Sequence, residues 1–395
     1  MTDLNRRHLL GATGAGVAIS AMGGAGNGAL AQARRPAGPR KPVLMKLGTQ
    51  EPTDVPNLIR FQRYGVKNVC GWYTIADPRR LHPTVDELKA VVDLCAKYGV
   101  QVDLTDSQIG RGEKSAVMMM GSGAERDREI EAFQNTIRNC AAAGVPSIKY
   151  YLSVLPIMRS GLVPGRGDTL YNKWNYAEAV ADPSRVLALR LKDAAGTYAE
   201  RAGLPSSYSA DLMWERITYF LNQVVPVANE YKVKLAQHPH DPGLPKEGFL
   251  QIASVLANVD GLKRFISIQE SPYHGLNFCQ GTVCEMLEKP AEQINDVIRY
   301  FGSRKKIFNV HFRNIRGGMS NNVAENFPDD GDIDMAGAVE AYREVGYDGM
   351  LCPDHIPVHR TVGGREAVES AEDQSWAFNY GYIRALLQSA AKARA

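Results

Sequence analysis

Short apolar runs alternate with amphipathic stretches along the chain from Val43 onward. The apolar runs are rich in Val, Ile, Leu and aromatic residues, a pattern that predicts buried strands. They cover residues 43–50, 66–73, 100–106, 147–156, 234–242, 275–282, 307–314 and 349–356. Between them, apolar residues recur at helical spacing, most clearly at 83–99, 128–144, 212–231 and 375–393. The alternation predicts a series of strand-and-helix units.

Strand-and-helix units in series place the strands parallel, with right-handed crossovers between them. Eight such units predict an α/β fold, a (β/α)8 TIM barrel. An open, doubly wound sheet is the alternative, but no glycine-rich phosphate loop follows the first predicted strand. The rhythm breaks only at 157–210, which is rich in Gly, Pro, Arg and aromatic residues. We therefore expect an insertion after the fourth strand, with a short helix near 186–201, that caps one rim of the barrel.

Residues 1–33 differ from the rest of the chain. They combine Arg6 and Arg7 with a mildly apolar, glycine-interrupted stretch and a small-residue cleavage site ending at Ala33. This pattern predicts a twin-arginine signal peptide and export to the periplasm by the twin-arginine machinery. A membrane-spanning helix is the alternative, but the apolar stretch is too short for it. We expect a linker at 34–42, a single catalytic domain at 43–395 and no membrane span in the mature protein.

Charge and cysteine content narrow the possible functions. Residues 1–41 hold six Arg or Lys against one Asp, so the formal net charge of +3 leaves −2 on the remainder. A nearly neutral body does not suit nucleic-acid binding and favours a small polar substrate. Twin-arginine export carries chains that fold in the reducing cytoplasm, so we expect no disulfides. The cysteines predicted to pack as small hydrophobic residues are Cys70, Cys95, Cys140 and Cys352.

Four potential metal ligands fall in four consecutive predicted strands: His238, Cys279, His311 and Asp354. They are 41, 32 and 43 residues apart, and each lies late in its apolar run. In a (β/α)8 barrel, the C-terminal ends of the strands form the catalytic rim. Two imidazoles, a thiolate and a carboxylate suit Mn²⁺, Fe²⁺ or Zn²⁺, whereas the thiolate disfavours Mg²⁺. A lone strand histidine or buried cysteine is usually structural, but four together predict a Lewis-acid centre and hence an enzyme.

The chain also resembles a known family. The motifs that carry the resemblance are HPHDP from His238, GLNFCQG from Gly275, HFRN from His311, GDIDM from Gly331 and PDH from Pro353. Across 43–390 the chain is similar to the mannonate dehydratases of hexuronate catabolism, barrel enzymes related to the xylose-isomerase-like group. The resemblance implies that the same four residues bind Mn²⁺, or Fe²⁺ in its place. It also implies dehydration of D-mannonate, or a related sugar acid, to a 2-keto-3-deoxy acid, and homo-oligomers are common among such barrels.

Two residues beside the ligands have predicted roles in this chemistry. His355, next to Asp354, is the first candidate for proton transfer, because an imidazole exchanges protons near neutral pH. Its alternative is a hydrogen bond to a neighbour without a catalytic role. Arg313 follows His311 by two positions and should share its strand face, where a guanidinium could meet a substrate carboxylate.

Other candidates have weaker support. His240 could be catalytic or could orient His238 in the binding site. Asp334 could be catalytic, but it begins a predicted helix and could equally be the N-cap. The residues predicted to contact substrate are Arg159, Trp174 and Asn314.

Departures from the relatives keep other functions open. His240 stands where the family motif has Asp, and 325–330 lacks the histidines that relatives carry before GDIDM. A tyrosine expected after the last strand has no counterpart between Thr361 and Phe378. The alternatives are a metal-dependent isomerase or epimerase, a lyase acting on oxidised glycosides, and a sugar-acid-binding protein without turnover.

Overall fold

The structure is a computed structural model that describes residues 40–107, 109, 119, 121–167, 169–184, 186, 206–319, 321–359 and 365–392. The predicted signal peptide and most of the predicted linker lie outside these residues. Most of the helix predicted near 186–201 lies outside them as well. Residues from Arg40 onward group into one unit.

Eight parallel strands close into a barrel, as the alternating pattern predicted. Their order around the barrel is β1-β12-β9-β8-β7-β4-β3-β2. The strands are β1 (Lys46–Thr49), β2 (Asn68–Gly71), β3 (Gln101–Asp106), β4 (Ser147–Tyr151), β7 (Lys234–His238), β8 (His274–Cys279), β9 (Ile307–His311) and β12 (Met350–Cys352). Each overlaps one of the predicted apolar runs, so the (β/α)8 prediction is confirmed.

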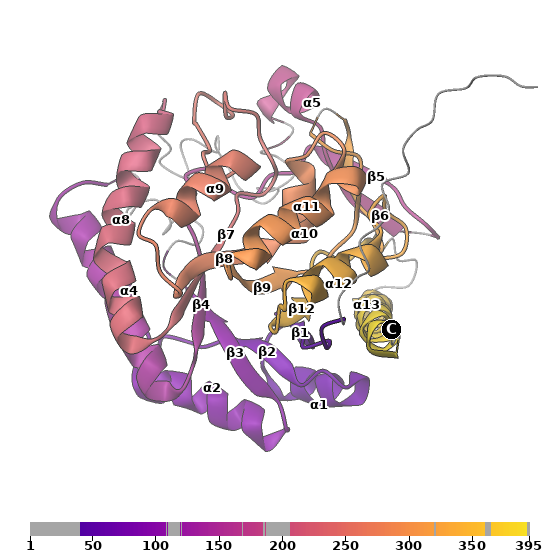
Figure 1. Ribbon diagram of the computed structural model, residues 1–395, viewed down its shortest axis with the longest axis horizontal. Coiled ribbons are helices and arrows are strands. Elements are labelled where there is room, and N and C mark those ends of the chain that lie inside the picture. The colour runs from indigo at the N-terminus through magenta and orange to yellow at the C-terminus, as the bar shows by residue number, and fades with distance from the viewer. Residues whose placement is uncertain are drawn as a thin grey trace, which may run out of the picture. The chain divides into compact units, whose positions relative to one another are not determined.

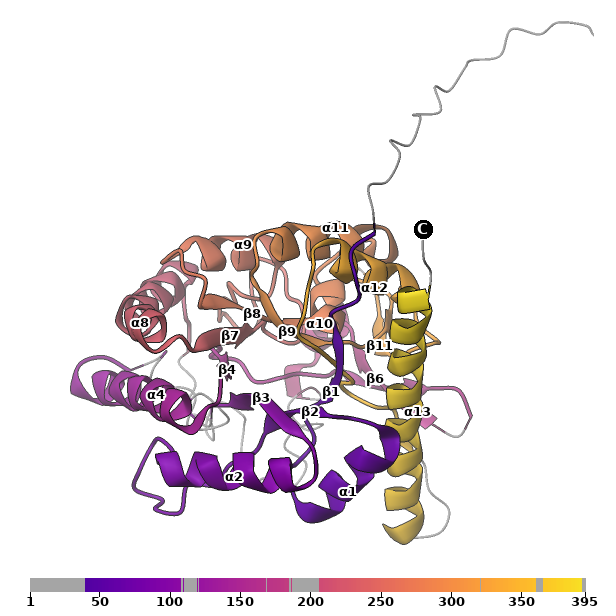
Figure 2. The same cartoon turned by 60° about the horizontal axis from the view of Figure 1, so that its bottom comes forward.

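Helices surround the barrel (Figure 1), and α13 runs beside α1 and β1 (Figure 2). They are α1 (Val55–Tyr64), α2 (Val85–Lys97), α4 (Ala124–Ala143), α5 (Tyr176–Ala181), α8 (Ala210–Tyr231), α9 (Val259–Ser267), α10 (Gln280–Glu285), α11 (Pro290–Ser303), α12 (Met335–Glu344) and α13 (Arg365–Lys392). The last helix begins well before the predicted start at 375.

Side-chain caps fix where two of these helices begin. Thr84 accepts a hydrogen bond from the Glu87 backbone N–H, and Glu87 accepts one from that of Thr84, which forms a capping box on α2. Asp334 caps α12 by accepting from the Gly337 N–H. The N-cap alternative for Asp334 is therefore confirmed.

The predicted insertion after the fourth strand builds a second, antiparallel sheet. Its strands are β5 (Gly161–Pro164), β6 (Thr169–Trp174), β10 (Ile315–Arg316), β11 (Val323–Glu325) and β13 (Val358–His359). Only β5 and β6 come from the insertion, and β6 pairs with β5, β11 and β13. The insertion thus joins segments that follow the last two barrel strands in the chain.

Aromatic packing holds the barrel wall to its helices where the insertion departs. Phe133 of α4 lies edge-on to Tyr150 of β4 and to Phe220 of α8, with ring centroids 5.2 Å apart in both pairs. All six cysteines are buried and none forms a disulfide, as predicted. Among the described helices, none is long and apolar enough to cross a membrane.

Candidate metal centre

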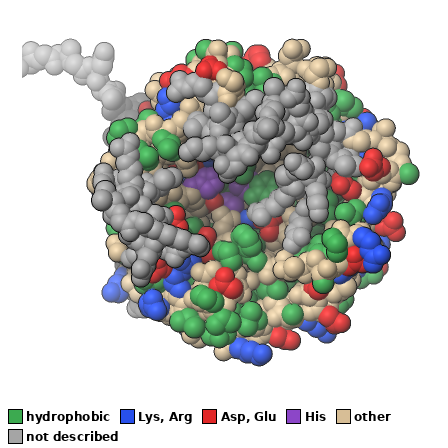
Figure 3. All heavy atoms as spheres, turned by 180° about the vertical axis from the view of Figure 1, so that it is seen from behind, with side chains coloured by type: hydrophobic (Ala, Val, Ile, Leu, Met, Phe, Trp, Pro, Cys, Tyr) green, Lys and Arg blue, Asp and Glu red, His purple; other side chains and the backbone are tan. Residues whose placement is uncertain are grey.

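The four predicted ligands converge at the C-terminal ends of neighbouring strands. His238, Cys279 and His311 are the last residues of β7, β8 and β9, and Asp354 follows the end of β12. Strand register sets Cys279 and Cys352 both opposite His311, which brings the ends of β8, β9 and β12 level. All four side chains are buried. On the face drawn in Figure 3, histidine side chains are visible within a central hollow.

The donor atoms of this quartet lie at distances that fit one metal ion. His238 Nε2 is 3.2 Å from His311 Nδ1, and Asp354 Oδ2 is 3.6 Å from Cys279 Sγ and 3.7 Å from His311 Nδ1. Ligands bonded to a common ion at about 2.0–2.3 Å must lie at such separations from one another. The buried Nε2 of His311 has no hydrogen-bond partner in the described part of the chain. The residues present therefore fit a divalent transition metal.

The histidines are held in the state that metal binding needs. His238 Nδ1–H donates to the Pro239 carbonyl at 2.6 Å, which leaves the Nε2 lone pair directed at the quartet. Burial lowers the pKa of His238 to about 4 and that of His311 well below its usual value. Both rings are therefore neutral at physiological pH.

Cys279 and Asp354 supply the anionic part of the set. Burial raises the pKa of the Cys279 thiol to about 12, so the thiolate forms only with a cation present. Thr282 donates its hydroxyl to Cys279 Sγ at 3.0 Å. Burial opposes the charge on Asp354, but the nearby cationic groups outweigh it and hold its pKa well below the usual range. The amide of Gln50 donates to Asp354 Oδ1 at 2.5 Å, so this carboxylate is fixed from outside the quartet.

Arg313 does face the same side as His311, as strand alternation predicted, but its guanidinium is already engaged. It lies 3.2 Å from an Asp354 oxygen, and its other contacts, at 3.0–3.3 Å, are with Asp241, Glu285 and Glu325. The arginine is 3% exposed. Its contacts make it the centre of a buried ionic network behind the ligands, whereas binding of a substrate carboxylate stays a prediction.

Arg159 belongs to the same network and is also buried. Its guanidinium donates to Asp241 and Glu325 and lies 3.2 Å from His355 Nδ1. Burial disfavours its charge, but Asp241 and Glu325 outweigh that effect and raise its pKa. Arg159 was predicted to contact substrate, and the structure instead directs it at protein carboxylates.

The remaining candidates contact other parts of the protein. His240 is buried, and its Nδ1 lies 3.0 Å from the Pro242 carbonyl. Trp174 is buried on β6 against Phe249, with ring centroids 6.1 Å apart. Asn314 uses its whole amide within the protein, donating to Pro328 and Ile333 carbonyls and accepting from Ile315 and Ile333 N–H groups. These contacts close the loop after β9, and the roles assigned to His240, Trp174 and Asn314 stay predictions.

His355 lies beside the quartet and is the accessible histidine of the site, with a side chain 27% exposed. Its Nε2 is 3.8 Å from Asp354 Oδ1, and its Nδ1 is 2.7 Å from Glu325 Oε1. Burial lowers its basicity, but Asp354 and Glu325 outweigh this and raise the pKa of His355. Its backbone φ of 47° is left-handed, a strained conformation for a residue with a side chain.

Sequence reasoning missed three contributors. Glu325 and Glu285 bind the two arginines, and Gln50 links Asp354 to Lys149, whose Nζ donates to the Gln50 side-chain oxygen Oε1 at 2.8 Å. Gln50 directly follows β1, so its place at the strand end was a usable signal. Glu325 and Glu285 lie outside the barrel strands and gave no such signal.

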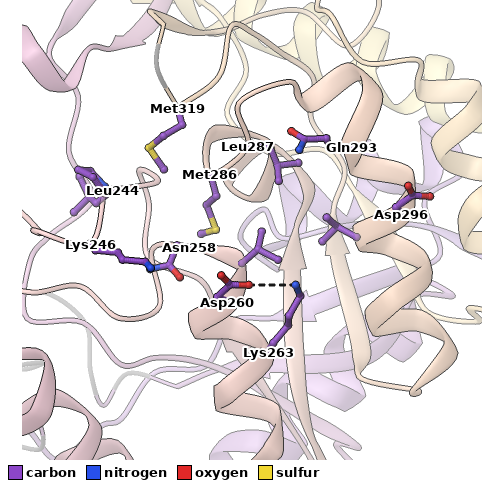
Figure 4. A pocket seen from close by; sticks show the side chains of 13 residues that line it. Leu244, Lys246, Asn258, Asp260, Lys263, Met286, Leu287, Gln293, Asp296 and Met319 are labelled. Atoms are coloured by element: carbon purple, nitrogen blue, oxygen red, sulfur yellow. Dashed lines mark hydrogen bonds and ion pairs between the residues drawn. The ribbon is translucent and has the colours of Figure 1, made fainter.

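A separate surface pocket of about 450 Å³ lies between α9 and α11 (Figure 4). Its lining includes Met286, Leu287 and Met319, and the Asp260 and Lys263 side chains pair with each other at 3.2 Å. None of its lining residues is a histidine or cysteine, so it does not offer the nitrogen and sulfur donors of the quartet.

Comparisons with known proteins identify the family. The family model for D-mannonate dehydratase (UxuA) matches residues 58–393. The mannonate dehydratase of Thermotoga petrophila is 30% identical over 266 residues, covering 61% of this chain and 69% of the relative. Mannonate dehydratase 2 of Halalkalibacterium halodurans is 29% identical over 244 residues, covering 58% and 68%.

Solved structures show the same fold. The mannonate dehydratase of Streptococcus suis serotype 2 superposes with a TM-score of 0.70 at 20% identity, over 88% of this chain and 95% of that one. A xylose isomerase domain protein from Planctomyces limnophilus reaches a TM-score of 0.50 at 15% identity, over 90% and 99%.

Proposed function

The chain belongs to the D-mannonate dehydratase family, and we propose that it removes water from D-mannonate, or a closely related sugar acid, to give a 2-keto-3-deoxy acid. It is a hydro-lyase by family. The observation that carries the proposal is the convergence of His238, Cys279 and His311, with Asp354 in contact with the last two, beside an accessible imidazole, His355. The strand-end positions of the four ligands predict this convergence.

The reaction requires a proton to leave the carbon next to the carboxylate and a hydroxyl to leave the following carbon. A divalent ion in the quartet would act as a Lewis acid, stabilising charge on the substrate's carboxylate and hydroxyl oxygens. His355 Nε2 is the group beside the quartet that can take up or deliver a proton. Arg313 and Arg159 hold the surrounding carboxylates in place.

For the metal we propose Mn²⁺, with Fe²⁺ as the second choice. Two imidazole nitrogens and a carboxylate suit either ion, and both accept additional oxygen ligands from a substrate. Zn²⁺ would bind the thiolate well but favours four ligands. Four protein ligands would leave less room for a sugar acid that binds the ion through two oxygens. Metal content of protein purified without added metal, measured by elemental analysis, tests this choice. Zinc as the dominant active metal would reject it.

We also propose that the protein acts in the periplasm. The support is the sequence of residues 1–33, with Arg6 and Arg7 ahead of the apolar stretch. Cell fractionation of the native host should find the mature protein in the periplasm. Replacing both arginines by lysine should retain it in the cytoplasm, and unchanged export would reject the twin-arginine route.

The substrate proposal is tested with purified protein loaded with Mn²⁺ and given a panel of aldonates and oxidised glycosides. We expect D-mannonate to lose one water and to give a 2-keto-3-deoxy acid by mass spectrometry. Chelation of the metal should stop the reaction, and Mn²⁺ should restore it. A product of unchanged mass would assign an isomerase or epimerase, and binding of a sugar acid without any product would assign a binding protein.

A further inference from the structure

We propose that Glu325 is a positioning residue that keeps the neutral His355 imidazole protonated on Nδ1, so that Nε2 is the atom that exchanges a proton with substrate. The catalytic consequence rests on the proposed dehydration, but the placement of the proton does not. Three features of the structure support this placement of the proton: the donors around the Glu325 carboxylate, the position of His355 Nε2 and the backbone pairing of β6.

The Glu325 carboxylate is buried and surrounded by donors. Its Oε1 accepts a hydrogen bond from the Arg159 guanidinium. The same oxygen lies 3.3 Å from Arg313 Nη1 and 2.7 Å from His355 Nδ1. Its Oε2 accepts from the Asn172 amide at 2.7 Å. Burial disfavours its charge, but Arg159, His355 and Arg313 outweigh burial and lower the pKa of Glu325. Glu325 is therefore an ionised carboxylate.

An ionised carboxylate can only accept hydrogen bonds, and its 2.7 Å contact with His355 Nδ1 is shorter than the 3.2 Å contact of that nitrogen with the Arg159 guanidinium, so His355 donates from Nδ1. The neutral ring then has its lone pair on Nε2. This nitrogen is 3.8 Å from Asp354 Oδ1, on the side of the ring toward the quartet. The hydrogen bond thus selects both the tautomer and the orientation that proton transfer at the metal centre needs.

The insertion after the fourth strand holds the two partners together. The β6 strand pairs with β11 through Trp174 and Val323, two residues before Glu325. At its other end, β6 pairs with β13 through Leu170 and Val358, three residues after His355. The insertion also contributes two hydrogen-bond donors to the Glu325 carboxylate, Arg159 and Asn172. Trp174 takes part in this arrangement through the pairing of its backbone with that of Val323.

The strained backbone of His355 supports the same reading. A φ of 47° at a residue with a side chain persists only where the surroundings enforce it. The Glu325 hydrogen bond and the β13 pairing flank this residue and supply that restraint. Together they direct the ring toward the quartet.

Glu325→Met gives the decisive perturbation, because it keeps much of the side-chain volume and removes both acceptor oxygens. The Arg159 guanidinium, 3.2 Å from His355 Nδ1, is then the donor that meets this nitrogen, so Nδ1 becomes the acceptor and the proton moves to Nε2. We expect kcat on D-mannonate to fall by about 10²- to 10⁴-fold, the usual contribution of general acid–base catalysis, with KM changed by less than about threefold. Glu325→Asp, which keeps the charge, should recover part of kcat. The matched control is Glu178→Met on α5, an exposed side chain paired with Lys173, which should keep full activity.

A spectroscopic readout separates this inference from the proposed function. In ¹⁵N-histidine-labelled protein loaded with diamagnetic Zn²⁺, the His355 signals are assigned by their loss in His355→Gln. At a pH where the ring is neutral, we expect the Nδ1–H tautomer in the native protein and the Nε2–H tautomer in Glu325→Met. The Nε2–H tautomer in the native protein, or one tautomer in both proteins, would overturn the inference. Nδ1–H in a protein that does not dehydrate any sugar acid would reject the proposed function and leave the inference standing.

Discussion

Removal of the Arg313 guanidinium should destabilise the protein mainly through Glu285. Arg313→Met keeps much of the side-chain volume but removes the charge between Asp241, Glu285, Glu325 and Asp354. Loss of one partner from a buried ion pair costs about 3–5 kcal/mol. Asp241 and Glu325 keep Arg159, and Asp354 keeps Gln50. We therefore expect a loss near the lower limit, about 3 kcal/mol.

In Arg313→Met, Glu285 is the carboxylate that has no cation in contact among the described residues. Its remaining contact there is the Gly243 N–H, at 3.3 Å. Neutralising it should relieve the defect. The double variant Arg313→Met/Glu285→Gln should recover about 1–2 kcal/mol of the loss, within the range known for directly coupled residues. Urea unfolding at one fixed concentration of free metal gives the four free energies of the cycle. A loss under about 1 kcal/mol for Arg313→Met, or additive effects in the double variant, would refute this account of the network.

Three further predictions address the metal, acid stability and helix capping. Thr282→Val removes the hydroxyl that donates to Cys279 Sγ, so metal affinity in a chelator competition should fall by about 10- to 100-fold; equal affinity would contradict it. Burial lowers the pKa of His274 to about 4 against about 6.5 in the unfolded chain, so the unfolded state takes up the proton first. The contribution of His274 to stability is therefore constant above pH 6.5 and falls by roughly 3 kcal/mol between pH 6.5 and 4. His274→Gln should flatten the acid limb of the unfolding free energy, and an unchanged limb would contradict that. Thr84→Ala should cost about 1 kcal/mol by breaking the capping box with Glu87, which urea unfolding can check; no loss would mean that the box contributes nothing.

The barrel and its ligands could be predicted because each depends on local signals. Strand runs were visible as apolar segments, and His238, Cys279 and His311 proved to be the last residues of their strands. Neighbouring parallel strands end at the same rim of the barrel, so residues at their C-terminal ends lie close together. Asp334 was recognisable as a cap for the same reason, since a cap acts within one turn of helix.

Glu325 could not be found in this way. It lies on β11, a strand of three residues that pairs with β10 nearby and with β6 far away in the chain, and three residues are too few for periodicity to mark it. Arg159 was predicted to contact substrate, but its carboxylate and imidazole partners come from separate loops. For Asn314, a polar residue after a ligand strand was assigned to substrate, and its amide also closes the loop, which the sequence does not show.

The claim on which the account depends is that the strand-end quartet holds the metal ion. The direct test is the number of metal ions bound per folded chain, measured by elemental analysis after dialysis, in the native protein and two cysteine variants. We predict one tightly bound ion in the native protein and in Cys95→Ala, whose cysteine is buried on α2 away from the quartet. We predict loss of most of that ion in Cys279→Ala, with circular dichroism showing that the barrel still folds. Full metal occupancy in folded Cys279→Ala would contradict the assignment.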